Sequence, residues 1–143
     1  MGPKLVEYLK YEVEDSGICW ITFNRPERRN ALMGNSQENS TVAKVGEYMR
    51  AADDDPAVRV IVLTGEGQGF CSGADMRRDN DPSVLGENFV GNRDHTESPD
   101  FVRQHFFHGF TQLHRDISLI RKPTIAMING AAVGSGMDMA LHC

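Results

Sequence analysis

The sequence has few cysteines, no long apolar run and no signal-peptide segment. Its three cysteines, Cys19, Cys71 and Cys143, are far apart and odd in number, which is not typical of a disulfide framework or a zinc site. No apolar run approaches the roughly 20 residues that cross a bilayer, and the first residues lack an apolar leader segment. We therefore expect a reduced, cytoplasmic protein that does not bind membranes.

Basic residues are also in deficit. Twenty acidic residues face 15 lysines and arginines, and the net charge of −5 argues against nucleic acid as the main partner. Of the 143 residues, 40% are apolar and 24% charged, which suits one soluble domain with a modest core. No carboxylate or cysteine completes a ligand set with His105, His108 and His114, so we expect no metal.

The hydrophobic pattern predicts a β-hairpin followed by alternating helices and strands. Two strands are expected on either side of a turn at Asp15–Gly17, because apolar and charged residues alternate there. The further expected elements are a helix at 36–52, a buried strand at 58–65, a helix at 101–120, a buried strand at 124–128 and a final helix. This alternation is typical of an α/β fold with parallel strands.

Two glycine-rich joins follow the two expected buried strands. They read GEGQGFCSGADM (65–76) and NGAAVGSGMDM (129–139). Two such joins facing each other could aim two backbone N–H groups at one oxygen, as an oxyanion hole does. Tight turns are the alternative. A phosphate loop is less well supported, because the joins match neither G-x-G-x-x-G nor G-x-x-x-x-G-K-[ST].

Three segments, FNRPERRNAL (23–32), GFCSGADM (69–76) and KPTIAMINGAAVGSGMDMAL (122–141), resemble signature segments of the crotonase (enoyl-CoA hydratase/isomerase) superfamily, in its order and spacing. The resemblance implies a crotonase-like ββα superhelix that is incomplete at its C-terminus, with residues 1–143 as the N-terminal part of a single domain. It implies an enzyme that stabilises a thioester enolate of acyl-CoA, with coenzyme A as part of the substrate and no separate cofactor. It also implies a homo-oligomer, a trimer or hexamer, for the full-length form.

The resemblance also implies which residues form the site. The backbone N–H groups of Ala74 and Ser135 would form the oxyanion hole, although many relatives have glycine at the second position. Residues in the two joins would line the coenzyme A path: Ser72, Gly73, Ala74, Asp75, Met76, Val133, Gly134 and Ser135. Arg28 and Arg29 fall where relatives contact coenzyme A. Arg77 and Arg78 would either meet its phosphates or lie on a solvated surface.

Asp138 follows Ser135 by three residues, so both should share one face of a helix. Its position resembles the first of two catalytic glutamates of the hydratases, with a side chain one methylene shorter. Its carboxylate, beside Met137 and Met139, is expected to have a raised pKa and to move protons. An acid favoured there only by the helix dipole is the alternative.

The family's second acid is expected outside these 143 residues, and apolar residues on the sheet should be exposed. We therefore expect an enoyl-CoA hydratase or isomerase. The alternative is a non-catalytic coenzyme A-binding or assembly module. A third hypothesis, with the least support, is a glycine-rich nucleotide-binding domain.

Overall fold

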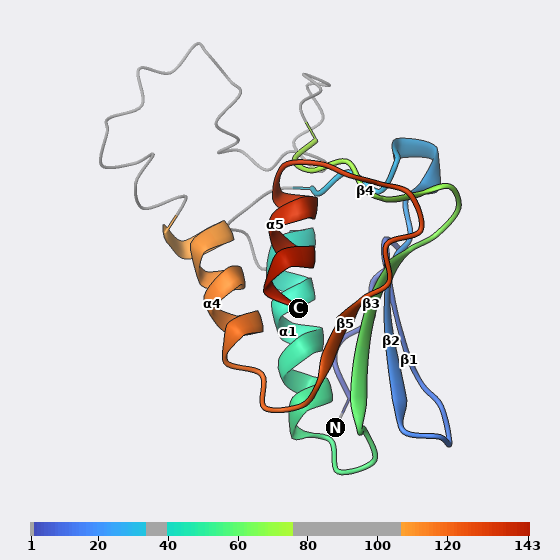
Figure 1. The fold of residues 1–143 in the computed structure, drawn as a ribbon, viewed down its shortest axis with the longest axis vertical. Coiled ribbons are helices and arrows are strands. Elements are labelled where there is room, and N and C mark those ends of the chain that lie inside the picture. Colours follow the sequence, from blue (N-terminus) through green and yellow to red (C-terminus); the bar gives the residue numbers. More distant parts are fainter. Residues whose placement is uncertain (1, 34–39, 76–106) are drawn as a thin grey trace.

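A four-stranded sheet with helices along one face organises the computed structural model, which describes residues 2–33, 40–75 and 107–143 (Figure 1). The strand order in this sheet is β1-β2-β3-β5. β1 (Leu9–Val13) and β2 (Ile18–Phe23) are antiparallel, whereas β3 (Val60–Gly65) runs parallel to β2 and β5 (Thr124–Ala126) runs parallel to β3. The predicted hairpin and the α/β class with parallel strands are confirmed.

The hairpin forms because the sequence between its strands suits a tight turn. Gly17 has a φ of 86°, a left-handed conformation that glycine adopts without a Cβ penalty, and its N–H donates to the carbonyl of Glu14 at 2.9 Å. The N–H of Glu14 in turn donates to the carbonyl of Ile18 at 2.9 Å, which starts the strand ladder. The turn therefore sets the register in which Leu9 faces Phe23.

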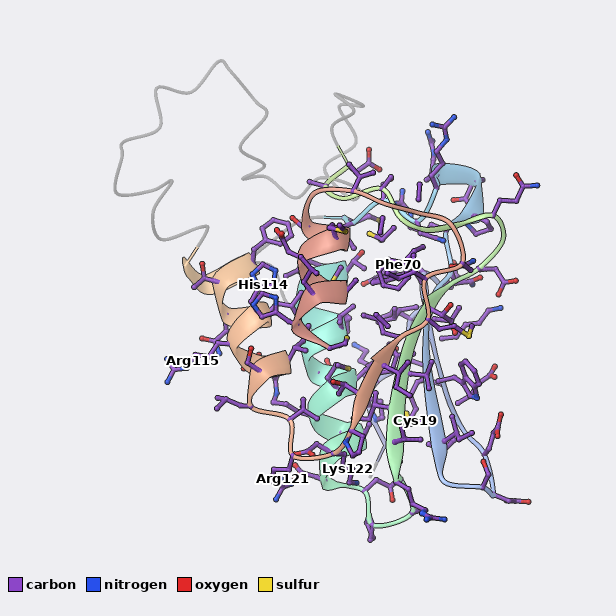
Figure 2. The ribbon with its side chains drawn as sticks, viewed as in Figure 1. Cys19, Phe70, His114, Arg115, Arg121 and Lys122 are labelled. Atoms are coloured by element: carbon purple, nitrogen blue, oxygen red, sulfur yellow. The ribbon has the colours of Figure 1, made fainter. Side chains whose placement is uncertain are left out.

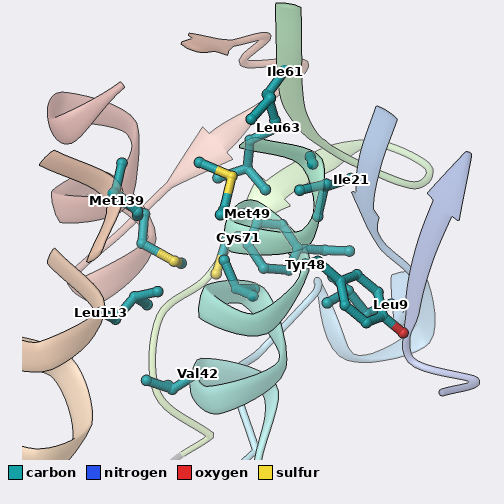
Figure 3. Close-up of a cluster of buried hydrophobic side chains, with 14 of the residues drawn as sticks. Leu9, Ile21, Val42, Tyr48, Met49, Ile61, Leu63, Cys71, Leu113 and Met139 are labelled. Carbon is teal, nitrogen blue, oxygen red and sulfur yellow. The ribbon is translucent and has the colours of Figure 1, made fainter. Parts of the chain in front are cut away.

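Helix α1 (Thr41–Asp54) covers the sheet with the apolar stripe that the sequence predicted. Ser40 caps it, because its hydroxyl accepts a hydrogen bond from the N–H of Ala43 at 3.1 Å. The buried stripe consists of Val42, Val45, Tyr48, Met49 and Ala52. The stripe belongs to the same buried cluster as Leu9, Ile21, Ile61 and Leu63 of the sheet, and Figure 3 shows Tyr48 and Met49 beside these strand residues, so the core lies between α1 and the strands.

Two further helices complete this layer: α4 (Gln112–Ser118) packs against α1, and α5 (Ser135–His142) packs against α4 and the strands (Figure 1). A π-helical turn, η2 (Phe107–Thr111), leads into α4, and Leu113 and Ile117 of α4 are buried in the core. The helix expected at 101–120 thus ends at Ser118, earlier than predicted, and its first residues lie outside the described part. The final helix, α5, is confirmed and buries Met139 in the same core.

The prediction that strand 124–128 is buried is wrong. β5 covers only Thr124–Ala126 and is the edge strand of the described sheet, so it has no neighbouring strand on one side there. Ile125 is 51% exposed, and the following Met127 and Ile128 are 44% and 52% exposed. The strand at 58–65 behaves as predicted, since β3 lies between two neighbours and is buried along most of its length.

Two very short strands form a second, parallel sheet that the sequence did not predict. β4 (Gly69–Cys71) lies within the first glycine-rich join, and β6 (Ala131–Ala132) lies within the second. Their residues are too few and too rich in glycine and alanine to show a strand pattern. This pairing determines how the two joins meet.

Candidate functional site

The two glycine-rich joins lie side by side, because β4 and β6 pair in parallel. Gly69 faces Ala131 and Cys71 faces Ala132, and the N–H of Val133 donates to the carbonyl of Cys71 at 2.9 Å. Parallel strands end at the same edge, so residues 72–75 and 133–135 leave the small sheet together. The first residues of α5 therefore lie next to the segment that contains Ala74.

The backbones of the joins approach so closely that several positions require glycine, among them Gly73 and Gly136. A Cβ at Gly73 would lie 2.7 Å from the carbonyl oxygen of Val133 and 3.6 Å from the nitrogen of Ser135, and Gly73 has a φ of +85°. A Cβ at Gly136 would lie 2.5 Å from the carbonyl oxygen of Cys71. These glycines allow the two joins to touch each other. Two separate tight turns would not require such a contact.

The N–H group of Ala74 points away from its neighbouring segment. Leu32 and Ala74 form an isolated parallel bridge, in which the N–H of Leu32 donates to the carbonyl of Gly73 at 2.8 Å and the N–H of Asp75 donates to the carbonyl of Leu32 at 3.0 Å. In such a bridge the central residue directs its own N–H to the opposite side. Among the described residues, no acceptor is bonded to the N–H of Ala74.

Ser135 presents a second donor at the start of α5. As the first residue of the helix it has no intrahelical acceptor for its N–H, and no other acceptor is bonded to it in the described part of the chain. The helix dipole adds partial positive charge at this end. Gly134 precedes it with a φ of 53°, and Val133 is 55% exposed. Two unused donors therefore belong to adjacent segments.

Arg28 and Arg29 lie in the turn after β2. Arg28 ends the 3₁₀ turn η1 (Pro26–Arg28), and Arg29 follows in the left-handed conformation with a φ of 51°. The carbonyl of Arg29 accepts a hydrogen bond from the N–H of Ser72 at 3.1 Å, so the turn is attached to the first join. Contact of these arginines with coenzyme A stays a prediction. Met76, Arg77 and Arg78 lie outside the described residues.

Asp75 is buried, and its partner was not predicted from the sequence. Asp75 is only 4% exposed, and its carboxylate accepts hydrogen bonds from the two terminal nitrogens of Arg25 at 3.4 and 3.3 Å. The contact of Asp75 with coenzyme A stays a prediction. Arg25 stands within FNRPERRNAL, where only the two later arginines were singled out.

Two asparagines that sequence analysis also missed hold the loop between β3 and β4. The amide of Asn30 donates to the carbonyls of Glu66 and Gly69 at 3.0 and 2.8 Å. The amide of Asn129 donates to the carbonyls of Gly65 and Gly67 at 2.8 and 2.9 Å. Asn30 is 2% exposed with a φ of 56°. Both asparagines lie inside the quoted segments, and this position was the signal available in the sequence.

Asp138 lies on the first turn of α5, three residues after Ser135, and it is exposed. Its backbone carbonyl contacts the Nδ1 of His142 at 2.7 Å. The ring of His142 stacks on His114 of α4, with 4.6 Å between ring centroids and 9° between planes. Figure 2 shows His114 between α4 and α5. The helix that carries Asp138 is thus held to α4 partly through two imidazoles.

Burial lowers the pKa of His114 below its ordinary 6.5, and His142 adds to the decrease whereas Asp138 opposes it. As the pH falls, His114 is therefore protonated at a higher pH in the unfolded chain than in the folded chain. The stability that this group contributes is present above pH 6.5 and is lost as the pH falls through the lower folded value. We expect the free energy of unfolding, measured by urea titration, to decrease from pH 7 to 5.

The substitution His114→Gln should flatten this pH dependence, because it removes the titrating group from the interface. His142→Gln is the matched comparison. It removes the ring that stacks on His114 but leaves His114 buried, so part of the slope should remain. An unchanged slope in His114→Gln would contradict the assignment.

Neither thiol chemistry nor metal chemistry is indicated near the joins. Cys71 is buried, and its burial raises the pKa of the thiol to about 11, so the nucleophilic thiolate is scarce at neutral pH. Among the described residues, no group of three or more His, Cys, Asp or Glu side chains is placed to hold a metal ion. Nor does that part of the chain include a helix with the length and apolarity to cross a membrane.

The sequence profile of the enoyl-CoA hydratase/isomerase family matches residues 13–143. The chain belongs to this family. The crotonase resemblance and the crotonase-like fold predicted from it are confirmed. Among curated proteins, the chain is 35% identical over 127 residues to a Mycobacterium leprae protein named probable enoyl-CoA hydratase. It is 39% identical over 127 residues to another protein of that name from Mycobacterium tuberculosis.

Solved structures share the fold. A probable enoyl-CoA hydratase from Mycobacterium smegmatis superposes with a TM-score of 0.74 at 25% identity, covering 96% of this chain and 47% of that one. A Pseudomonas aeruginosa protein superposes with a TM-score of 0.70 at 34% identity, covering 99% of this chain and 52% of that one. The two sequence relatives are matched over 89% of this chain but only 42% and 41% of their own lengths. The chain thus spans about half the length of its relatives or less.

Proposed function

We propose that this chain supplies the oxyanion hole and one proton-transfer group of an enoyl-CoA hydratase or isomerase acting on acyl-CoA thioesters. The observation that carries the proposal is the pair of unused N–H donors, Ala74 and Ser135, on two segments that β4 and β6 hold together. The family membership supports it. Coenzyme A belongs to the substrate, and the proposal includes no separate cofactor, metal or nucleic acid.

The chemistry requires such donors. When water adds to the β-carbon of an enoyl thioester, or when a proton leaves the α- or γ-carbon, negative charge develops on the thioester oxygen. Two fixed N–H groups aimed at that oxygen stabilise the enolate without any reorganisation, and one such donor is worth about 3–4 kcal/mol of barrier. The N-terminal end of α5 adds favourable potential at the same place.

Asp138 is the proposed proton-transfer group. It stands one helical turn from Ser135, so the carboxylate and the Ser135 N–H share a face of α5. A hydratase also needs a second group to complete water addition, and its position is a prediction for the longer protein. The arginines Arg28 and Arg29 are proposed to contact the phosphates of coenzyme A, because their turn is hydrogen-bonded to Ser72.

Turnover and binding test this function separately. The purified protein is incubated with crotonyl-CoA and longer enoyl-CoAs, and loss of the enoyl thioester absorbance is followed. Calorimetry with a saturated acyl-CoA measures binding. Turnover supports the enzyme. Binding without turnover supports the alternative, a coenzyme A-binding or assembly module, and no binding of any acyl-CoA contradicts both.

Asp138→Asn is expected to lower kcat by about 10²–10⁴-fold, the usual contribution of general acid–base catalysis, while acyl-CoA affinity changes little. The amide keeps the size of the side chain but cannot carry the proton. Asp54→Asn is the control, because Asp54 is an exposed acid at the far end of α1 whose partner is Arg121. Equal activity in both variants would remove Asp138 from the mechanism.

We further propose that the longer protein is a cytoplasmic homo-oligomer, a trimer or hexamer. The exposed apolar side chains at the sheet edge and on α5, such as Ile125 at 51% and Leu141 at 74%, support association with further polypeptide. Analytical ultracentrifugation of that protein tests the proposal, and a monomer at micromolar concentration would contradict it.

A further inference from the structure

Arg25 and Asp75 form an ion pair beside Ala74 that is largely hidden from solvent. Their side chains are 12% and 5% exposed, and the Nη2 of Arg25 lies 3.3 Å from the Oδ2 of Asp75. The Nη1 of Arg25 also donates to the carbonyl of Ala31 at 2.7 Å. One guanidinium therefore contacts both the turn after β2 and the first glycine-rich join.

This pair reinforces the bridge that sets the direction of the Ala74 N–H. Ala31 precedes Leu32, and Asp75 follows Ala74, so the guanidinium contacts the residue next to each bridge partner. The backbone N–H of Arg25 is also held, because it donates to the Oδ1 of Asn30 at 2.9 Å. A shift of Asp75 away from Arg25 would strain the hydrogen bond from the Asp75 N–H to the carbonyl of Leu32 and move the Cα of Ala74, which would change the direction of the Ala74 N–H.

Stability alone does not account for a pair at this position. Desolvating two charges costs about as much as their attraction returns, so a buried ion pair is a weak source of folding energy. What a guanidinium provides is direction, because its planar N–H groups have fixed angles. A pair that adds little stability but much directional constraint is suited to hold a donor in place.

We propose that Arg25 and Asp75 are positioning residues that fix the orientation of the Ala74 N–H toward the thioester oxygen. This inference rests on the proposed function for the identity of the acceptor. The geometry is independent of that function, because the bridge between Leu32 and Ala74 is made by backbone hydrogen bonds within this chain. Neither side chain takes part in proton transfer.

Amide hydrogen exchange in the ligand-free chain tests the geometry. Asp75→Asn and Arg25→Lys should each make the N–H groups of Leu32 and Asp75 exchange about tenfold faster than in the parent, through local opening. The N–H groups of β3 should keep their rates. Arg121→Gln is the matched control, since it breaks an exposed arginine–aspartate pair with Asp53 and should change neither bridge amide. Unchanged exchange at the bridge in both variants would overturn the inference.

The double substitution Arg25→Met with Asp75→Leu covers the case in which a single variant fails to fold, because it leaves no unpaired buried charge. If the pair only stabilised the fold, this variant would keep the exchange rates of the parent at both bridge amides. Positioning predicts fast exchange there although the chain remains folded.

Vibrational spectra of bound acyl-CoA labelled at the thioester carbonyl test the function. In the parent, donation from Ala74 should lower the carbonyl stretching frequency relative to free ligand, and Asp75→Asn should reverse part of that shift. A full shift in that variant would overturn the inference and leave the proposed function standing. If the parent binds no acyl-CoA, the proposed function fails, while the exchange data still decide whether the pair holds the bridge.

Discussion

Replacing Gly73 by alanine is expected to destabilise the folded chain by about 2–4 kcal/mol, because two penalties add at one position. The φ of +85° is costly for any residue with a Cβ, and that Cβ would lie 2.7 Å from the carbonyl oxygen of Val133. Urea denaturation followed by circular dichroism measures the loss. Since the clash is with the join that leads into α5, acyl-CoA affinity should fall as well.

Gly69→Ala is the matched control for that experiment. Gly69 lies in the same join, has no neighbour within 4 Å of an added Cβ and does not have a left-handed φ. The same chemical change there should alter the free energy of unfolding by less than about 1 kcal/mol. Equal losses in the two variants would show that the contact between the joins is not what requires Gly73.

Phe70→Ala is expected to cost about 3–5 kcal/mol, the range for a buried aromatic side chain. Phe70 is completely buried, and its ring meets Phe23 edge to face, with 5.7 Å between centroids and 86° between planes. Figure 2 shows it between the helices and the sheet. The effect should reach the site, because β4 has only three residues and Phe70 is the one that joins it to β2 through a ring contact.

The comparison variant is Phe70→Leu, which retains most of the buried apolar volume and should lose less than half as much stability. Thermal unfolding and acyl-CoA calorimetry on the same samples separate the two consequences. If Phe70→Ala folds as stably as Phe70→Leu, the cavity has been refilled and β4 does not depend on this ring.

The local hydrophobic pattern predicted those helices and strands whose own residues show which side is buried. The hydrophobic pattern predicted a helix at 36–52, which contains most of α1, and a buried strand at 58–65, which is β3. Burial of β5 could not be predicted in this way. Its sequence is as apolar as that of β3, but its position at the sheet edge depends on which neighbours it has.

The sequence predicted which segments form the candidate site. It did not predict the contacts that hold those segments together. Glycine spacing and family resemblance pointed to both joins. The strands β4 and β6, the Arg25–Asp75 pair and the amides of Asn30 and Asn129 each depend on partners distant in sequence. Short polar or glycine-rich stretches carry no periodicity that could reveal such partners. Only the assembled backbone shows them.

The pairing of β4 with β6 also has a kinetic consequence. The β1–β2 hairpin closes over a handful of residues, whereas Gly69 and Ala131 are roughly sixty residues apart, and closing so long a loop delays their encounter. The surface that presents Ala74 and Ser135 should therefore be among the last parts to become native during refolding. A pulse-labelling experiment should find the amides of β1 and β2 protected while those of residues 72–75 still exchange freely. Molecules in which the hairpin is already native would then not yet be able to bind a ligand.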